Sequence, residues 1–327
     1  MSEFRQDLVS GEWVLIAPER AKNPSNLKKI DLYQPKDGCP FEDLSKNGNE
    51  VIWTYPEGDN WEIAVAKNKY PAVKQGACGP VLKLGPHSIS EGVGEHDLFV
   101  LREHDKMLGD LNSEEMLSLV RTYLKRYREV SKNECTEYVM IFHNHGHEAG
   151  ASVYHPHSQL ISTPILPPFI SRNFNGAYEF YKKNNKYVFG LMIDWEKEQN
   201  KRIVFENEFF IALCPFASLF PYQVLILPKN REAHFDQLNE EAELPFAEAL
   251  STVFKKIKVG LGNPSFNYFI HSAPVGGSMK DLHEFYTWHV EIVPKFSTAA
   301  GFELATGIDI NVIDPDNAAE KLRCAQI

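Results

Sequence analysis

The chain has 327 residues, of which 43% are hydrophobic and 24% are charged, and this balance excludes a mostly disordered chain and a fibrous repeat. Its net charge of −10, with no run of Lys or Arg longer than a pair, argues against nucleic acid as a partner. Because no stretch of about 18 or more apolar residues exists and the N-terminal residues are polar, we expect no membrane association and a cytoplasmic location.

The first predicted elements are a strand over residues 97–101 and a helix that begins after Asn112. Asn112 and Glu115 have the spacing of a capping box, which stabilises the start of a helix. Apolar residues then recur at the i, i+3 and i+4 positions that form one buried helix face. A strand over residues 138–142, a loop rich in glycine and histidine, and a strand with His155 and His157 follow.

The same order of elements recurs in the second part of the chain. A strand over residues 223–227 precedes a helix that begins at Asn239, and strands over residues 267–271 and 289–291 follow. Three histidines have counterparts in this second part: His104, His143 and His155 match His234, His271 and His289. We therefore expect an α+β fold in which one unit is present twice and forms a single antiparallel sheet with packed helices. The alternative is that this order recurs by chance.

Five of the twelve histidines fall within residues 143–157, and the predicted chemistry lies there. On a strand, His155, His157 and Gln159 share one face. The glycines of the preceding loop allow backbone N–H groups to approach an anion such as a phosphate. A histidine beside such a loop is a good nucleophile toward phosphorus, because one ring nitrogen attacks while a backbone carbonyl holds the other as N–H. The expected product is a nucleotidyl-histidine intermediate.

These residues resemble the active-site segment of the galactose-1-phosphate uridylyltransferases, the transferase branch of the histidine-triad superfamily. The matching positions are Asn144, Gly150, Ser152, His155-Pro156-His157 and Gln159. Residues 10–22 resemble the segment with which the family begins, which helps to bind the nucleotide, and residues 68–72 resemble its base- and ribose-contacting loop. Residues 300–311 are similar to the corresponding segment of the plant-type ADP-glucose phosphorylases. The resemblance spans nearly the whole chain.

The resemblance implies a UDP-glucose:hexose-1-phosphate uridylyltransferase-like enzyme, whose partners are a nucleotide sugar and hexose 1-phosphate. It implies His157 as the nucleophile and Gln159 as the residue that contacts the transferred phosphoryl group. Hydrolases of the superfamily carry a third histidine in place of Gln159, and an amide cannot act as a general acid–base, so transfer is favoured over hydrolysis. The implied substrate-binding residues are Arg20, Asn68, Asn144, Gly150, Ser152 and Glu303.

The resemblance also implies two histidine-triad-like units and a homodimer. The proline-rich stretch over residues 163–169 ends the first unit, so we expect units over residues 1–169 and 170–327. Residues 289–291 read His-Val-Glu where the first copy has His155-Pro156-His157. Only the first copy is therefore expected to keep a nucleophile.

Three other functions stay open at this point. Lys69 and Asn23 stand where the family has an acidic residue and a second arginine, and this leaves the nucleotide base undecided. An ADP-sugar phosphorylase, which transfers an adenylyl group to phosphate, is one alternative. The others are a dinucleoside polyphosphate hydrolase and a metal-stabilised nucleotide-binding protein without catalysis.

The resemblance implies a structural zinc site. Cys39, His104 and His155 stand at matching positions, and Glu42 replaces the second cysteine with a carboxylate that zinc accepts. The alternative is that Cys39 is a small buried apolar residue and no metal binds. A further metal at His271, His289 and Glu291 is implied in some relatives, but Asn173 falls where another carboxylate ligand is expected, which argues against it.

We predict no catalytic or metal-binding role for the remaining cysteines or for the histidines within residues 143–147. The five cysteines include no CxxC pair, so we expect no disulfide framework and assign no role to four of them: Cys78, Cys135, Cys214 and Cys324. His143, His145 and His147 alternate along the chain. We expect them to be loop residues that tune the charge near a phosphate or face the solvent, and not to form a metal-binding tract.

Overall fold

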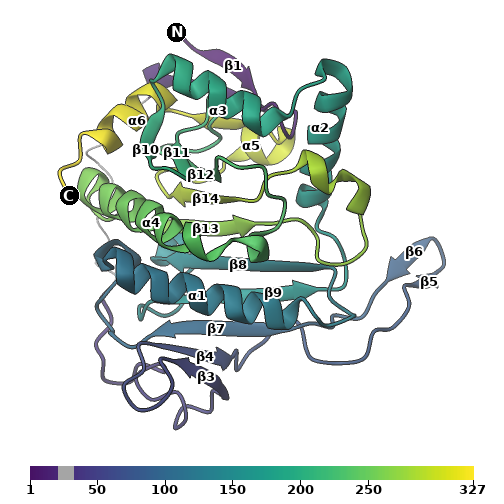
Figure 1. Cartoon of the computed structure of the whole chain (residues 1–327), viewed down its shortest axis with the longest axis vertical. Coiled ribbons are helices and arrows are strands. Elements are labelled where there is room, and N and C mark those ends of the chain that lie inside the picture. The colour runs from purple at the N-terminus through teal and green to yellow at the C-terminus, as the bar shows by residue number, and fades with distance from the viewer. Residues whose placement is uncertain (21–32) are drawn as a thin grey trace.

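In the computed structural model, which describes residues 1–20 and 33–327, ten strands form one antiparallel sheet (Figure 1). Asn23 and the last two residues of the predicted nucleotide-binding segment lie outside the described residues. The strands of this sheet, in chain order, are β3 (Val51–Tyr55), β4 (Ile63–Lys67), β7 (His96–Leu101), β8 (Tyr138–His145), β9 (His157–Thr163), β10 (Ile203–Glu206), β11 (Phe210–Leu213), β12 (Val224–Pro228), β13 (Phe266–His271) and β14 (His289–Pro294).

The two halves of the sheet place their equivalent strands in the same order, counted from each outer edge to the middle. From one edge it is β3-β4-β7-β9-β8, and from the other it is β10-β11-β12-β14-β13, so that β8 and β13 pair in the middle. Helix α1 (Ser113–Val130) connects β7 to β8, and helix α4 (Glu240–Leu261) connects β12 to β13 in the same way. The predicted α+β fold with one unit present twice is confirmed.

Both long helices begin where their capping residues predict. The Asn112 side chain accepts hydrogen bonds from the Glu114 and Glu115 backbone N–H groups, and the Glu115 carboxylate accepts one from the Asn112 backbone N–H. Asn239 caps α4 by accepting from the Ala242 N–H, and Pro245 lies within the first two turns. These bonds satisfy N–H groups that have no partner inside the helix.

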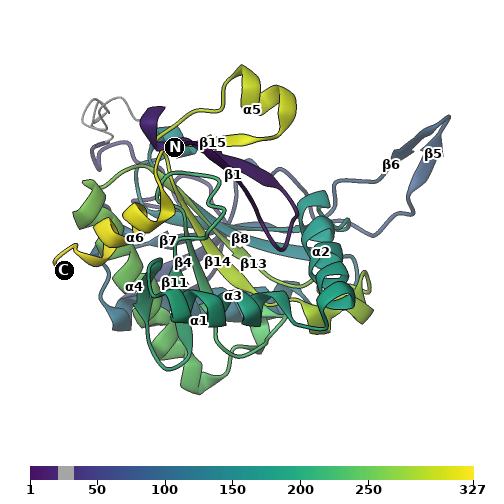
Figure 2. The same cartoon turned by 90° about the horizontal axis from the view of Figure 1, so that it is seen from above.

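One face of the sheet packs against α1 and α4. Alternate strand residues such as Ile141, Leu160 and Ile270 are fully buried in the core that these helices cover. Because side chains alternate along a strand, Phe142, Gln159 and Phe269 point to the opposite face. Figure 2 shows α1 and α4 on one side of the sheet, with β1 and β15 on the other. The polar side chains that could take part in a reaction, such as Gln159, therefore lie on the face of the sheet opposite to the main hydrophobic core.

Two helices that the sequence pattern did not indicate follow β9. They are α2 (Pro168–Asn184) and α3 (Val188–Gln199), and Pro168 stands in the first helical turn of α2, where proline is tolerated. Phe174 and Phe189 of these helices both contact the Tyr286 ring, and they belong to one buried cluster with Ile211 of β11 and Leu227 of β12. The two helices therefore cover part of the second copy of the unit.

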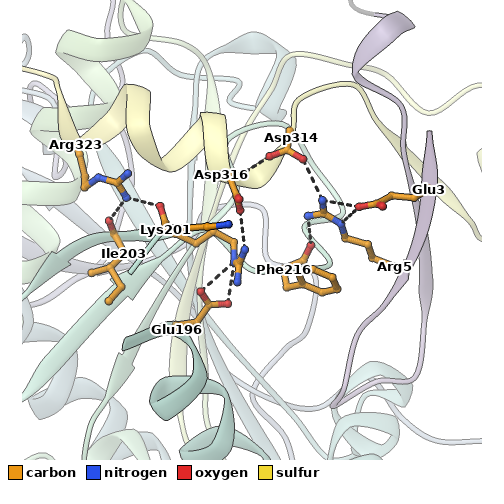
Figure 3. Close-up of polar contacts among 10 residues, drawn as sticks. Glu3, Arg5, Glu196, Lys201, Ile203, Phe216, Asp314, Asp316 and Arg323 are labelled. Atoms are coloured by element: carbon orange, nitrogen blue, oxygen red, sulfur yellow. Dashed lines mark hydrogen bonds and ion pairs between the residues drawn. The ribbon is translucent and has the colours of Figure 1, made fainter. Parts of the chain in front are cut away.

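The two terminal segments of the chain are bound together. Strands β1 (Glu3–Gln6) and β2 (Trp13–Ile16) form a small sheet with β15 (Asp309–Asn311), which runs parallel to β2. Arg5 forms an ion pair of 3.0 Å with Asp314, which caps helix α6 (Pro315–Arg323). Figure 3 shows this pair beside the contacts of Asp316 and Arg323 with the segment around Lys201. The nucleotide-binding segment predicted near the N-terminus and the predicted C-terminal segment that contains Glu303 therefore lie in neighbouring parts of the fold.

Several short elements complete the described chain. The hairpin of β5 (Leu82–Leu84) and β6 (His87–Ile89) projects from the body, and α5 (Gly301–Thr306) stands above the sheet (Figure 2). The 3₁₀ helices are η1 (Pro18–Arg20), η3 (Leu108–Asp110), η4 (His147–Ala149), η5 (Phe235–Gln237) and η6 (Lys280–Phe285). Among the helices that the structure describes, none is long and apolar enough to cross a membrane.

One disulfide contradicts the interpretation of the cysteines. Cys78, which precedes the projecting hairpin, is bonded to Cys135, which follows α1. The two residues are 57 positions apart, and the fold brings them together with Cα atoms 5.3 Å apart. Sequence spacing gave no indication of this pairing, because it depends on how the hairpin segment returns to the body.

Candidate active site and metal centre

The strand register places the predicted catalytic residues on the open face of the sheet. Across the β7–β9 pair, Val100 lies opposite His157 and Leu98 lies opposite Gln159. Across the β8–β9 pair, Phe142 lies opposite Gln159. His157 and Gln159 therefore point the same way, as the period of a strand predicts.

The His157 imidazole is held in one tautomer. Its Nδ1 lies 2.9 Å from the backbone carbonyl oxygen of His155, which can only accept, so Nδ1 carries the proton and Nε2 carries a lone pair. The side chain is 7% exposed, and its ring packs at a T-shaped angle against Phe41 with 4.9 Å between centroids. Burial lowers the pKa of His157 to about 4, so the ring is neutral near pH 7. A neutral ring with a lone pair on Nε2 is the form that attacks phosphorus.

Gln159 belongs to a chain of polar contacts that also includes Asn68. Gln159 Oε1 lies 2.8 Å from Nε2 of His96, and Asn68 Nδ2 lies 3.0 Å from the same nitrogen. The structure therefore brings two predicted site residues together through a histidine that sequence reasoning missed. His96 begins β7, and only the pairing of β7 with β9, which the sequence does not display, places it beside Gln159.

Asn144 and the following loop lie at the junction of the two units. Asn144 Oδ1 accepts a hydrogen bond of 2.8 Å from Asn267, which also donates to the Ala149 carbonyl at 2.8 Å. Gly150 has a φ of 83°, a left-handed conformation that favours glycine. These contacts fix the loop against β13.

Two backbone N–H groups of this loop are not free to bind a phosphate, although the glycines of the loop predicted that its N–H groups could. The N–H of Gly150 donates to the His147 carbonyl at 2.9 Å, and the N–H of Ala151 donates to the Gly146 carbonyl at 3.1 Å. Both groups are therefore engaged inside the loop. Ser152 is exposed and lies directly after this turn.

Two predicted substrate-binding residues lie outside this group. Arg20 is exposed at the end of η1, beside the small sheet of the terminal segments. Glu303 lies in α5, and its carboxylate accepts a hydrogen bond of 3.0 Å from the Ala300 N–H at the start of that helix. Neither side chain is hydrogen-bonded to His157, Gln159 or His96 in the described part of the chain.

The predicted metal ligands form a compact cluster. Cys39, Glu42, His104 and His155 each offer one ligand atom, and these atoms all lie within 4.8 Å of one another. The Nδ1 atoms of His104 and His155 are 3.2 Å apart, and Glu42 Oε1 lies 2.9 Å from the first and 3.3 Å from the second. Among the residues that the structure describes, no other group of three or more such side chains meets this distance.

The hydrogen bonds around this cluster fit a metal ion. Nε2 of His104 lies 2.7 Å from the Gln34 carbonyl oxygen, and Nε2 of His155 lies 2.6 Å from the Leu101 carbonyl oxygen. Both Nε2 atoms therefore donate, which leaves the two Nδ1 lone pairs facing one another. Two facing lone pairs repel unless a cation lies between them, and a backbone partner on the far nitrogen is the usual support of a metal-bound histidine. Cys39 Sγ, 3.6 Å from Nδ1 of His155, completes a set of four donors.

The second copy of the unit carries a related cluster, but the predicted alignment was wrong. Phe269 lies opposite Glu291 just as Phe142 lies opposite Gln159, and each pair belongs to equivalent strands. The counterpart of Gln159 is therefore Glu291, and the counterpart of His157 is His289. His289 even repeats the tautomer of His157, since its Nδ1 donates to the carbonyl two residues earlier at 3.0 Å. The sequence match failed because the loops of the two copies differ in length.

The carboxylate of this second cluster is hydrogen-bonded to neighbouring side chains. Glu291 accepts hydrogen bonds from Gln223 at 2.7 Å and from His271 at 3.1 Å, so both of its oxygens are engaged. His289 lies against Phe189 of α3, with ring centroids 5.7 Å apart. A carboxylate beside a covered imidazole would repel a phosphate, so the expectation of a single nucleophile is consistent with this geometry.

The expectation for the neighbouring histidines was wrong in two cases. His143 and His145 lie in β8 and are buried, with 2% and 9% of their surface exposed, while His147 is exposed in η4. Both rings stack on Phe266. The alternating pattern was the mark of a strand that continues to His145, and the two rings belong to the core.

The burial of His145 predicts a loss of stability in acid. Burial lowers the pKa of His145 from 6.5 to about 4, so below pH 6.5 the unfolded chain binds a proton that the folded chain does not. The free energy of unfolding should therefore fall between about pH 6.5 and pH 4. In His145→Phe this contribution is removed and the fall becomes smaller. Urea unfolding at several pH values, with His87→Phe of the exposed hairpin as control, measures this; equal slopes for both variants would contradict it.

The chain is similar to known proteins over most of its length. The family described as galactose-1-phosphate uridyl transferase, N-terminal domain, matches residues 1–167, and a domain of unknown function, DUF4921, matches residues 94–325. The ADP-glucose phosphorylase of Arabidopsis thaliana is 29% identical over 98% of this chain and 92% of its own length. The galactose-1-phosphate uridylyltransferase of Thermotoga maritima is 29% identical over 100% of this chain and 99% of its own.

Solved structures share the fold over the whole chain. The crystal structure of an ADP-glucose phosphorylase from Arabidopsis thaliana with bound ADP-glucose has a TM-score of 0.85 and 26% identity, and the match covers 100% of both chains. A uridylyltransferase structure has a TM-score of 0.76 and 25% identity, and the match covers 99% of this chain and 98% of that one.

Proposed function

Because the chain belongs to the galactose-1-phosphate uridyl transferase family, we propose that it transfers a nucleotidyl group between sugar phosphates through a covalent bond to His157. The chain is a nucleotidyltransferase that acts on sugar phosphates. The observation that carries the role of His157 is the hydrogen bond from its Nδ1 to the His155 carbonyl, which leaves the Nε2 lone pair for attack.

Two displacements at phosphorus complete the proposed reaction. Nε2 of His157 attacks the α-phosphorus of a nucleotide sugar, the bond from this phosphorus to the sugar phosphate breaks, and hexose 1-phosphate leaves. An oxygen of an acceptor phosphate then attacks the same phosphorus and the bond to Nε2 breaks. Gln159 and Ser152 donate hydrogen bonds to the phosphoryl oxygens, which gain negative charge in each transition state.

The acceptor and the base define two candidate reactions. Exchange of hexose 1-phosphates on UDP-glucose is the first, and Asn68, Asn144 and Gly150 would then contact the nucleotide. Transfer of an adenylyl group to phosphate is the second. It is favoured by the closer structural likeness to the ADP-glucose phosphorylase and by the C-terminal segment that contains Glu303. We propose Arg20 and Glu303 as further substrate contacts in either reaction.

An assay of four substrate pairs separates these reactions. The enzyme is incubated with ADP-glucose or UDP-glucose, each with inorganic phosphate or galactose 1-phosphate, and the nucleotide products are separated by anion exchange. A phosphorylase forms ADP from ADP-glucose and phosphate, whereas a uridylyltransferase forms UDP-galactose from UDP-glucose and galactose 1-phosphate. Free mononucleotide without any acceptor would instead identify a hydrolase, and no product from any pair would contradict the proposal.

We propose that the metal at Cys39, Glu42, His104 and His155 is a structural zinc ion. Four protein donors without an open position are typical of such sites, and the ion would hold the segment around Cys39 against the start of β9. A homodimer, a cytoplasmic location and a division into units at residue 169 stay predictions.

A further inference from the structure

We propose that His96 is a positioning residue that orients the Gln159 amide, so that the NH2 group of Gln159 faces the transferred phosphoryl group. The inference rests on the proposed function and adds a residue that neither the sequence motif nor the family match assigns. It is carried by two hydrogen bonds of one imidazole, with the Ala72 N–H and with the Gln159 amide, and by the same arrangement in the second copy of the unit.

The proton of the His96 ring is assigned by a backbone group. The N–H of Ala72 points at Nδ1 of His96 with 2.9 Å between the nitrogens, and a backbone N–H can only donate. Nδ1 therefore holds the lone pair, and Nε2 of the neutral ring holds the proton. Nε2–H then donates to the atom of Gln159 that lies 2.8 Å away, which must be the amide oxygen Oε1.

This bond decides which end of the Gln159 amide meets the phosphate. With Oε1 held by His96, the NH2 group points away from β7 and is left to donate. A rotated amide would present its oxygen to the negatively charged phosphoryl oxygens and repel them. The orientation exists before the substrate arrives, so no energy is spent on it during the reaction.

Asn68 is oriented by the same segment. Its Oδ1 accepts a hydrogen bond of 2.9 Å from the Tyr70 N–H, so its Nδ2 faces His96 at 3.0 Å. Since Nε2 of His96 carries a proton, this contact sets two donors side by side and contributes no hydrogen bond. The NH2 group of Asn68 is therefore better satisfied by an acceptor from a ligand, which suits its proposed place beside the nucleotide.

The second copy of the unit repeats the arrangement with different residues. His96 stands two residues before Leu98, the partner of Gln159, and Gln223 stands two residues before Leu225, the partner of Glu291. Gln223 donates from Nε2 to Glu291 Oε1 at 2.7 Å, as His96 donates to Gln159 Oε1. In the first copy His96 donates to Gln159, which stands two residues after His157. In the second copy Gln223 donates to Glu291, which stands two residues after His289. The repeat also shows that a glutamine at this position reaches the same oxygen.

The test measures the rate at which the enzyme becomes nucleotidylated. Rapid-quench mixing with ADP-glucose or UDP-glucose, followed by intact mass, gives this rate for the wild type and the variants. His96→Phe keeps a ring but removes the donor, and we expect a rate about 10-fold lower, which corresponds to the loss of one hydrogen bond. His96→Gln, which introduces the side chain that Gln223 supplies in the second copy, should recover most of the rate. His87→Phe in the exposed hairpin is the control for a histidine-to-phenylalanine change.

A double-mutant cycle separates positioning from a merely structural role. In a Gln159→Ala background, which itself should lower the rate about 100-fold, His96→Phe should have no further effect because its partner is gone. A further 10-fold loss in that background would overturn the proposal, as would a wild-type rate for His96→Phe. If the wild type forms no adduct with either nucleotide sugar, the proposed function fails, and the role of His96 fails with it.

The tautomer is tested independently of catalysis. In a long-range ¹H–¹⁵N spectrum of the full chain, assigned with His96→Gln, the Nε2 of His96 should carry the proton and Nδ1 should not. The opposite tautomer would overturn the orientation of Gln159 even if the enzyme is active. The thermal unfolding temperature of each variant identifies any that fails to fold, and the spectrum of the wild type then decides.

Discussion

His157→Ala is expected to form no nucleotidyl adduct and to lose activity by about 10⁴-fold or more, because the covalent route needs the Nε2 lone pair. In the wild type, incubation with the nucleotide sugar that proves to be the substrate should add the mass of one nucleotidyl group. Acid lability of this adduct, typical of a phosphorus–nitrogen bond, would separate it from an ester on Ser152 or Ser158. Intact mass and steady-state rates together measure the effect.

The control for this variant keeps the surroundings of the site. His147→Ala removes an exposed imidazole ten residues earlier in the chain and should leave the adduct and the rate unchanged. Circular dichroism of His157→Ala should match the wild type, whereas its Tm should fall because the buried ring that packs against Phe41 is lost. A cooperative thermal transition shows that the variant is folded at the assay temperature. An adduct of normal yield in His157→Ala would show that another residue is the nucleophile.

His104→Ala is expected to release the metal and to destabilise the fold. Ion binding to the folded state alone contributes about 4 kcal/mol when the free ion is at 1,000 times its Kd, which corresponds to roughly 5 to 10 °C in Tm for a chain of this size. The rate of nucleotidylation should also fall, because the metal would hold His155, whose carbonyl orients the nucleophile. Metal content by mass spectrometry and differential scanning calorimetry measure the two effects.

Two matched variants sharpen this experiment. His234→Ala removes the sequence counterpart of His104 in the second copy, where the imidazole contacts His283 at 3.0 Å, and it should leave the metal content unchanged. Glu42→Cys restores the ligand that the family pattern has and should retain zinc at chelator concentrations that strip the wild type. Purified wild type with no bound metal, and no change of Tm on adding zinc, would contradict the site.

Much of the fold was predictable because its signals are local. The capping box at Asn112 and Glu115 fixed the start of α1, and apolar periodicity identified α4. The metal cluster was also predictable, since the resemblance supplied all four positions and the structure brings them together. The pair of His157 and Gln159 followed from the period of a single strand.

The rest depended on contacts between segments that are distant in the sequence. The bonds of His96 with Gln159, of Asn267 with Asn144 and of Cys78 with Cys135 are set by strand register or by the return of a long segment. The alignment of the two copies was wrong for a related reason, because the loop between β8 and β9 is shorter than the loop between β13 and β14. Helices α2 and α3 were not predicted. The prolines at the start of α2 are typical of a loop and were interpreted as the end of the first unit.

The pairing of β8 with β13 has a consequence for the integrity of the chain. A cut between β9 and α2 would leave two fragments, and each would expose a long unpaired edge strand in the middle of what was one sheet. Each edge is the natural complement of the other, with Asn144 set against Asn267. If the chain is cut at this point, the two fragments should stay associated as a noncovalent complex. Fragments that have been separated should bind each other more tightly than they bind copies of themselves.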